Sequence, residues 1–232
     1  AVVMAGGRGT RLGAITEQIP KPMVRVAGRP ILERLVLHLV GFGIQRIFLS
    51  VNYLGHIIEE HFSDGARFGA SIRYSPEGEA LETAGGIANA LPLLGDKPFA
   101  VINGDIACDF DFALLPALAR AMPDRHWLAH LVLVPNPPHH PQGDFALRDG
   151  RVCDTGEAKF TFSGIGLYDP MLFAGIARGA KAKLAPLLRA AMTEGAVSGE
   201  LHAGRWMDVG TPERLAELDR LLAGENLSHK YS

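Results

Sequence analysis

The segment Ala1–Arg11, AVVMAGGRGTR, decides the fold class of this 232-residue chain, because a glycine-rich loop directly follows a short apolar run. The run Ala1–Met4 has the composition of a buried strand. In an open α/β sheet, the loop after such a strand directs backbone N–H groups toward a ligand, and glycines let the backbone approach phosphate oxygens closely. The segment therefore predicts an α/β protein with a phosphate-binding loop, and it leaves an ordinary glycine turn open as the alternative.

Strand-like and helical patterns alternate outward from this segment through the first half of the chain. They predict helices over about Ile31–Phe42 and Leu54–Phe62, on either side of a strand at Arg46–Val51. A further strand, helix and strand follow at Ser71–Tyr74, Ala84–Leu94 and Phe99–Asn103. This βαβ rhythm predicts a parallel sheet with helices on its faces.

The second half predicts a change to mixed pairing. Its strands are expected near Ala129–Pro135, Phe145–Arg148 and Phe160–Tyr168, with the proline-rich loop Pro135–Gly143 between the first two. Thr211 and Pro212 suit the N-cap and first turn of a closing helix over Glu213–Leu222. No repeat or linker divides the chain, so we expect one Rossmann-like α/β domain over residues 1–232, with a mixed, mostly parallel sheet flanked by helices.

Composition and charge limit the classes of partner. With 47% hydrophobic and 21% charged residues the chain can bury one substantial core, and its formal net charge of −2 gives no general attraction to nucleic acid or to an anionic membrane. The two cysteines, Cys108 and Cys153, form no paired motif, and no apolar run reaches the roughly 20 residues of a membrane span. We therefore expect a cytoplasmic protein, a monomer or weak homo-oligomer, that binds small molecules.

Two familiar nucleotide-binding patterns fail in the glycine-rich segment. The third glycine of G-x-G-x-x-G is replaced by Leu12, and G-x-x-x-x-G-K-[ST] is absent, which disfavours a dehydrogenase or a P-loop ATPase. Lys21 instead stands between Pro20 and Pro22, whose rings restrict the backbone around a single cation. Such a lysine suits a phosphate, although a surface loop is the alternative from this tripeptide alone.

Taken together, these motifs resemble those of the sugar-1-phosphate nucleotidyltransferases, whose signature A-G-G-x-G-T-R is followed by P-K-P. The resemblance covers essentially the whole chain, because Asn103–Asp105 and Trp206–Thr211 are similar to the metal-binding segments of that family. It implies a GT-A-type fold, a magnesium ion held by Asp105 and Asp208, and catalytic roles for Arg11 and Lys21. It also implies nucleotide phosphate contacts from Ala5, Gly6, Gly7, Gly9, Thr10, Arg11 and Lys21.

The two aspartates also make chemical sense by themselves. Magnesium takes oxygen ligands and is commonly held by one or two carboxylates together with substrate phosphates. Asp105 follows a predicted strand, at the end where open α/β sheets bind ligands, although Asn-Gly-Asp is also a common turn sequence. Asp208 has the alternative role of a local acceptor in a tight turn or at the entry to the closing helix.

The stretch Tyr74–Gly86 stands where the family reads the nucleobase, and here we expect nucleotide contacts from Glu77, Glu82 and Thr83. The sequence departs from the usual family pattern, in which many members carry Gln at the first of these positions and Gly at the second. A carboxylate can accept the N3–H of uracil or the N1–H and N2–H₂ donors of guanine, so the base stays open. A solvated acidic turn before a helix is the alternative to any base contact.

Several later segments, among them Arg73–Glu79, Ala129–Val134 and Lys183–Leu188, resemble most the bacterial uridylyltransferases for N-acetylmuramate 1-phosphate, which serve peptidoglycan recycling. The first sixty residues resemble generic members of the family. The resemblance places the sugar phosphate near Asn103, Gly143, Asp144, Glu157, Phe162 and Ser163, with Glu157 weakened by the absence of the common Glu-Lys-Pro segment. The adjacent His139 and His140 are expected to be solvated and receive no role.

The resulting hypothesis is a magnesium-dependent transfer of UMP from UTP to a sugar 1-phosphate, with release of pyrophosphate. An enzymatic alternative is a guanylyl- or uridylyltransferase for mannose, glucose or heptose 1-phosphate. A non-catalytic sensor of nucleotide sugars is the alternative from another class. Such a module could dispense with the arginine, the lysine or one carboxylate, and this sequence keeps all four.

Overall fold

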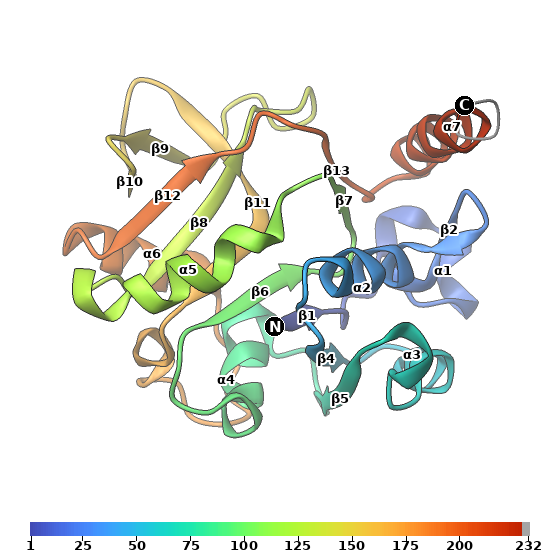
Figure 1. The fold of residues 1–232 in the computed structure, drawn as a ribbon, viewed down its shortest axis with the longest axis horizontal. Helices are drawn as coiled ribbons and strands as arrows, with labels where there is room; N and C mark the ends of the chain where they lie inside the picture. The colour runs from blue at the N-terminus through green and yellow to red at the C-terminus, as the bar shows by residue number, and fades with distance from the viewer. Residues whose placement is uncertain (229–232) are drawn as a thin grey trace.

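One nine-stranded mixed sheet runs through the computed structural model, which describes residues 1–228 (Figure 1). Its first half is parallel and has the order β5-β4-β1-β6, with β1 at Val2–Met4, β4 at Arg46–Val51, β5 at Ser71–Pro76 and β6 at Phe99–Asn103. The second half continues as β11-β8-β12-β10-β9, at Lys159–Tyr168, Ala129–Val134, Val197–Leu201, Arg151–Cys153 and Phe145–Arg148. Strand β11 is antiparallel to both β6 and β8, so the predicted mixed sheet is confirmed, with parallel pairing dominant only in the first half.

Helices cover both faces of the sheet. They are α1 at Ile15–Gln18, α2 at Ile31–Gly41, α3 at Gly55–Phe62, α4 at Glu82–Leu94, α5 at Leu115–Ala121, α6 at Leu184–Thr193 and α7 at Pro212–Ser228. Two short antiparallel pairs complete the fold, β2 at Arg25–Val26 with β3 at Arg29–Pro30, and β7 at Ile106–Cys108 with β13 at Trp206–Asp208.

The apolar runs of the central strands fill two separate cores because successive side chains of a strand point to opposite faces. Val3 packs on one face with Leu32 of α2, and Val2 packs on the other face with Ile87 of α4. A third, smaller cluster lies beneath α7, where Leu218 meets Leu12. Helix α7 is therefore anchored beside the glycine-rich loop and apart from the far half of the sheet, as Figure 1 shows.

The order of the parallel strands places a crevice next to β1. The chain leaves β1 through α2 to reach β4 and then passes through α3 to β5, whereas α4 carries it back to β6 on the other side of β1. Ligands of open α/β sheets bind at such a reversal, outside the carboxyl ends of the strands. Both the glycine-rich loop after β1 and the Asn103–Asp105 segment after β6 meet at this point.

The predicted strands and helices of the first half are confirmed to within two residues at each end, the largest differences being the end of β5 at Pro76 and the start of α4 at Glu82. The closing helix begins at Pro212 as expected, but its predicted end at Leu222 is wrong because α7 continues to Ser228. A single glycine costs a helix only about 1 kcal/mol relative to alanine, so Gly224 does not end it. The last four residues of the predicted domain, 229–232, lie outside the described residues.

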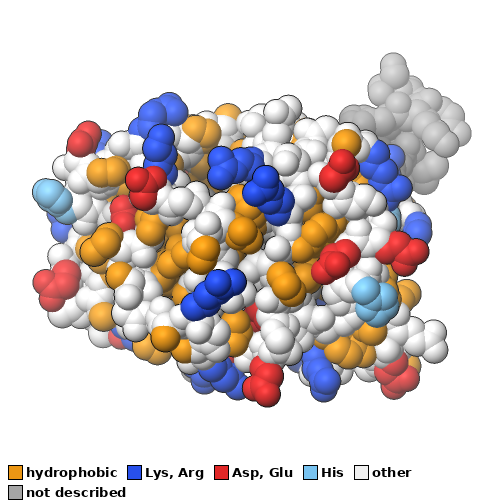
Figure 2. Space-filling model, turned by 90° about the horizontal axis from the view of Figure 1, so that it is seen from below, with side chains coloured by type: hydrophobic (Ala, Val, Ile, Leu, Met, Phe, Trp, Pro, Cys, Tyr) orange, Lys and Arg blue, Asp and Glu red, His pale blue; other side chains and the backbone are white. Residues whose placement is uncertain are grey.

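Within residues 1–228 no helix is both long and apolar enough to cross a membrane. Figure 2 shows one face of the molecule, on which basic, acidic and apolar side chains are interspersed. That face carries no continuous basic stripe of the kind that nucleic-acid phosphates attract.

Candidate active site

A cavity of about 270 Å³ opens where the strand order reverses. Its lining combines residues that are far apart in sequence: Met4, Gly6, Gly7, Lys21, Pro22, Glu77, Ala80, Glu82, Thr83, Asn103 and Asp105. The structure thus brings together the predicted glycine-rich loop, the lysine, the three predicted base-reading residues and the carboxyl end of β6. Most of the residues predicted for nucleotide binding surround one space.

The glycine-rich loop is shaped by two close approaches. Gly9 has a φ of +65°, and a Cβ built there would lie 2.8 Å from the Cβ of Lys21. Gly104 approaches β1 so closely that its N–H donates to the Met4 carbonyl at 2.9 Å. By contrast, a Cβ at Gly7 would meet nothing within 4 Å, so its backbone faces open space inside the cavity lining. The loop therefore packs tightly against its own support and leaves its middle free for a ligand.

Lys21 is nearly buried, with 9% of its surface exposed, and its Nζ forms an ion pair with the Asp105 carboxylate. The flanking Pro20 is extended, and Lys21 begins a short 3₁₀ turn that ends at Met23. A buried lysine needs a nearby anion, and here the anion is a predicted metal ligand. The surface-loop alternative for this lysine is therefore excluded.

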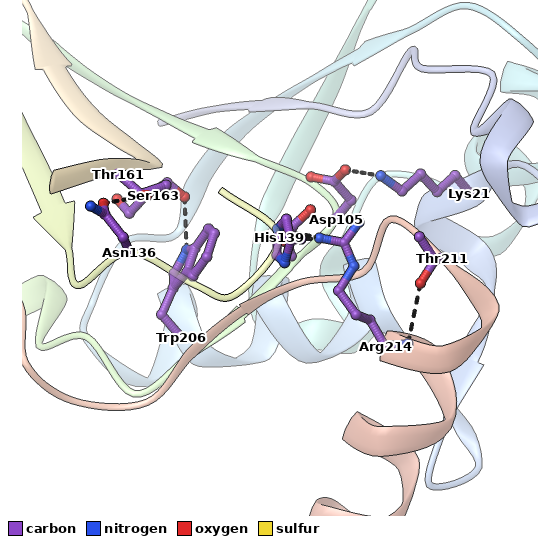
Figure 3. A network of polar contacts seen from close by, with 10 residues as sticks. Lys21, Asp105, Asn136, His139, Thr161, Ser163, Trp206, Thr211 and Arg214 are labelled. Atoms are coloured by element: carbon purple, nitrogen blue, oxygen red, sulfur yellow. Dashed lines mark hydrogen bonds and ion pairs between the residues drawn. The ribbon is translucent and has the colours of Figure 1, made fainter. Parts of the chain in front are cut away.

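The second carboxylate reaches the same place through the β7–β13 pair. Asp208 pairs with Ile106 in the β7–β13 ladder, and the Val209 N–H donates to the Asp105 carbonyl at 2.9 Å. The backbones of the two aspartates therefore lie next to each other, Asp105 just before β7 and Asp208 at the end of β13. Trp206 of β13 donates its indole N–H to the Ser163 carbonyl at 2.9 Å, next to a bulge in β11 (Figure 3). This bond fixes β13 to the main sheet.

Two residues at Asp208 were missed by the sequence reasoning. Arg214, in the first turn of α7, donates from Nη1 to Asp208 Oδ1 at 2.6 Å, and the Nε2 of His139 lies 3.1 Å from the same oxygen. Figure 3 shows His139 and Arg214 facing one another beside Asp105. Both histidine side chains are about 40% exposed, as expected of solvated residues, but each also contacts a carboxylate, since the Nε2 of His140 lies 3.1 Å from Asp144 Oδ1.

The pair Asp105 and Asp208 fits a hard divalent cation. Within residues 1–228 no group of three or more His, Cys, Asp or Glu side chains could enclose a metal, so the protein offers two carboxylates at most. Magnesium is usually held in this way, with the remaining oxygens supplied by substrate phosphates and water. Each carboxylate already forms an ion pair with a cation of the protein, Asp105 with Lys21 and Asp208 with Arg214, so both attract positive charge.

Glu77 is the central residue on the side of the cavity that is predicted to contact the nucleobase. Its Oε1 accepts the Ser50 hydroxyl at 2.5 Å and its Oε2 accepts the Leu81 N–H at 3.1 Å, so this carboxylate also holds the loop in place. A Cβ at Gly86 would lie 2.5 Å from Oε1, so any other residue there would displace this carboxylate. Glu82 begins α4 with a φ of +61°, an unusual conformation for any residue with a side chain.

The residues predicted for the sugar divide into two groups. Asn103 lines the cavity and packs against Gly164, whose φ is +81°. The others do not line the cavity: Gly143, Asp144, Phe162 and Ser163 form the neighbouring β9–β11 region, and Glu157 is exposed beyond it. In that region Asp144 accepts the Phe162 N–H at 2.8 Å, and the buried Ser163 hydroxyl donates to the Val132 carbonyl at 2.7 Å. Sugar binding by these residues stays a prediction.

Comparisons with known proteins agree with this fold and site. A family model described as nucleotidyl transferase matches residues 1–224. The N-acetylmuramate alpha-1-phosphate uridylyltransferase of Neisseria meningitidis serogroup B is 47% identical, over 95% of this chain and 97% of that protein. The mannose-1-phosphate guanylyltransferase of Mycobacterium tuberculosis is 40% identical over 50% of this chain and 32% of its own. The structure of HddC from Yersinia pseudotuberculosis complexed with GMP-PN has a TM-score of 0.78 at 25% identity, over 95% of this chain and 98% of that one.

The chain therefore belongs to the nucleotidyl transferase family, in the branch that acts on sugar 1-phosphates. Its activity is that of a sugar-1-phosphate nucleotidyltransferase, which uses small-molecule substrates. The expected Rossmann-like fold is confirmed by the mixed sheet and by the HddC structure.

Proposed function

We propose that this chain transfers UMP from UTP to N-acetylmuramate 1-phosphate, giving a UDP-sugar and pyrophosphate. The observation that carries the proposal is its 47% identity with the Neisseria uridylyltransferase, which extends over nearly the full length of both chains. The similarity to the Mycobacterium guanylyltransferase, by contrast, spans half of this chain. A role in peptidoglycan recycling and a cytoplasmic location belong to the same proposal.

The reaction is an in-line attack by an ionised oxygen of the sugar phosphate on the α-phosphorus of UTP, with pyrophosphate as the leaving group. Because this oxygen is already anionic at neutral pH, the protein needs no general base. Its tasks are to position two mutually repelling phosphates and to stabilise the charge of the transition state. A cavity lined by two glycines of the loop and a nearly buried lysine suits both tasks.

The chain's own groups divide these tasks. The open backbone at Gly7 would bind the nucleotide phosphates, and Arg11 would add a charged fork to them. Lys21, held between two prolines against Gly9, would lie between the reacting phosphates and offset their repulsion. Asp105 and Asp208 would hold magnesium, which supplies charge neutralisation on the phosphates when bound.

Base selection is proposed for the wall formed by Glu77, Glu82 and Thr83. Both oxygens of Glu77 already accept one hydrogen bond each, and a carboxylate has about four lone-pair sites, so it can accept more. It would accept the N3–H of uracil. The same acceptor could serve guanine, and the match to the Mycobacterium enzyme makes GTP with mannose 1-phosphate the second candidate pair.

A pyrophosphate-release assay tests this assignment directly. UTP and GTP are each paired with the 1-phosphates of N-acetylmuramate, N-acetylglucosamine, glucose, mannose and heptose. The proposal expects the highest kcat/KM for UTP with N-acetylmuramate 1-phosphate, and release that stops when EDTA removes divalent cations. A preference for GTP with mannose 1-phosphate would replace the proposal by the second candidate.

Two substitutions test the roles inside the cavity. Lys21→Ala and Asp105→Asn should each lower the rate of pyrophosphate release by more than about 100-fold, the scale of a lost electrostatic stabiliser in a catalytic site. Matched controls are Lys97→Ala and Asp96→Asn, which change exposed residues in the loop that precedes β6. This loop lies at the amino end of β6, whereas the cavity lies at its carboxyl end. Near-normal turnover in either cavity variant would contradict the assigned role.

A further inference from the structure

Arg214 is a buried cation for which neither composition nor motif gave a role. Its side chain is only 11% exposed, although it stands in the first turn of α7. The positive end of the helix dipole lies there, so a cation is unfavourable at this position unless something else requires it. The Nε of Arg214 is buried and has no hydrogen-bond partner within residues 1–228. Such a donor is costly, which points to an acceptor that arrives with a ligand.

A second guanidinium lies next to it. A Cβ built on Gly210 would overlap the Nη2 of Arg214 and lie 3.2 Å from the Nη2 of Arg11. Because Gly210 has no side chain, the guanidinium groups of both arginines can lie against its backbone. Arg11 is exposed, and none of the ion pairs formed within residues 1–228 includes it. Of these two guanidinium groups, that of Arg214 is paired with Asp208, so the positive charge of Arg11 is the one left for an anion.

The contacts of Arg214 are the kind that a ligand can exchange. Its Nη1 donates both to Asp208 Oδ1 and to His139 Nε2. The Nε2 of His139 lies within hydrogen-bond distance of both groups, so it can accept from the guanidinium or donate to the carboxylate according to its tautomer. A divalent cation that takes the Asp208 carboxylate would remove the main acceptor of Arg214. The same exchange applies at the other carboxylate, where Lys21 is the resident cation.

We infer that Arg214 is a phosphate-binding residue that forms, together with Arg11, a clamp for the β- and γ-phosphates of the nucleotide and for the pyrophosphate product. In the absence of ligands, Asp208 holds Arg214 in place. Guanidinium groups match phosphate oxygens with two parallel hydrogen bonds, and two of them at one point suit a group that carries several charges. This inference deepens the proposed function and rests on it for the identity of the anion.

Binding measurements on Arg214→Gln and Arg214→Lys test the clamp. The probes are Mn²⁺ alone, followed by electron paramagnetic resonance, and inorganic pyrophosphate with saturating Mg²⁺, followed by calorimetry. The glutamine variant should bind pyrophosphate at least tenfold more weakly, because a charged donor is lost. It should bind Mn²⁺ severalfold more tightly, because a competing cation is removed from Asp208. The lysine variant should fall between it and the unmodified protein for pyrophosphate.

The opposite changes expected in pyrophosphate and Mn²⁺ affinity distinguish this clamp from a purely structural role of Arg214. If Arg214 only anchored α7, its loss would weaken both ligands together and lower the thermal midpoint. Arg220→Gln is the matched control, since Arg220 is exposed on the same helix and its one hydrogen bond within residues 1–228 is to the Ala216 carbonyl. Gly210→Ala is an independent variant, because it displaces both guanidinium groups without removing a charge. It should also weaken pyrophosphate binding.

Unchanged pyrophosphate affinity in Arg214→Gln would overturn the inference, and so would weaker Mn²⁺ binding. These outcomes are independent of the substrates, since pyrophosphate is released in every nucleotidyl transfer. If pyrophosphate binds and depends on Arg214 while no nucleotide and sugar pair reacts, the clamp stands and the proposed function fails.

Discussion

Exchanging Glu82 for glycine and for alanine should reverse the usual order of these two residues in a helix. In an ordinary helix interior, alanine is more stable than glycine by about 1 kcal/mol. Glu82 begins α4 with a φ of +61°, where a Cβ costs roughly 1–2 kcal/mol and glycine has none. Glycine gives back about 0.4–1 kcal/mol through its freer unfolded chain. Glu82→Gly should therefore be more stable than Glu82→Ala by about 1 kcal/mol.

Comparing these two variants with each other isolates the contribution of backbone strain to the free energy of unfolding. Both variants lose the Glu82 carboxylate and with it the 4.0 Å ion pair to Lys181, in which both side chains are exposed. This loss therefore cancels in the comparison. The strained conformation persists because Ala182 clamps the start of the helix, donating to the Leu81 carbonyl and accepting from the Ala84 N–H, each at 3.0 Å. Strain of this kind survives only where the surroundings determine the backbone.

Urea unfolding of both variants measures the difference. For a chain of this size, 1 kcal/mol corresponds to about 2–4 °C in thermal midpoint, which gives a second readout. The control is Ala216→Gly on the exposed side of α7, which should lose about 1 kcal/mol in the ordinary direction. If Glu82→Gly proves less stable than Glu82→Ala by the margin of that control, the assigned strain is absent and the reasoning fails.

Two further predictions follow from contacts near the cavity. Gly9→Ala combines a left-handed backbone with a Cβ 2.8 Å from that of Lys21, so it should lower the free energy of unfolding by about 2 kcal/mol and the rate of pyrophosphate release by at least tenfold. Stability and activity within error of the unmodified protein would contradict this. Burial raises the pKa of Cys108 on β7 to about 11, so its alkylation by iodoacetamide should accelerate about tenfold per unit between pH 8 and 10. Subtracting the reaction of Cys108→Ser isolates this thiol, and a rate that is flat above pH 8 would show that the thiol is not so perturbed.

The sequence predicted the parallel half of the sheet because each of its strands alternates with a helix long enough to carry a periodic signal. The runs Arg46–Val51 and Phe99–Asn103 are mostly apolar, as is typical of strands buried on both faces. Trp206–Asp208 and Ile106–Cys108 are three residues each, too short for any period, and they pair across a long stretch of chain. Their pairing, which sets Asp105 beside Asp208, needed tertiary structure.

Arg214 could have been noticed from its position. A cation in the first turn of a helix opposes the helix dipole, and this one follows a predicted metal ligand by six positions. His139 gave no such signal, because a histidine in a proline-rich loop is ordinarily solvated. Its contact with Asp208 arises only because the loop after β8 folds back over the β13 end, which no local pattern predicts.

The opposite unusual feature, Glu82, was visible as a departure from the family's glycine, and the structure supplies its physical meaning. The position requires a positive φ, which glycine adopts freely and glutamate adopts at a cost. Glutamate at this position places a partly exposed carboxylate at the wall of the cavity. We therefore expect that Glu82→Gly, although it relieves strain, loses part of the preference between UTP and GTP.

Two neutral ion pairs at and beside the cavity explain how one site can take in so much negative charge. Lys21 rests on Asp105 and Arg214 rests on Asp208, so neither carboxylate is left uncompensated in the absence of ligands. When a cation and a polyanion arrive together, each charged group exchanges one partner for another, and no buried charge is left unpaired. The hydrogen bond from Val209 to the Asp105 carbonyl fixes the spacing of the two pairs. Val209→Pro, which removes this backbone N–H, should therefore impair both pairs at once.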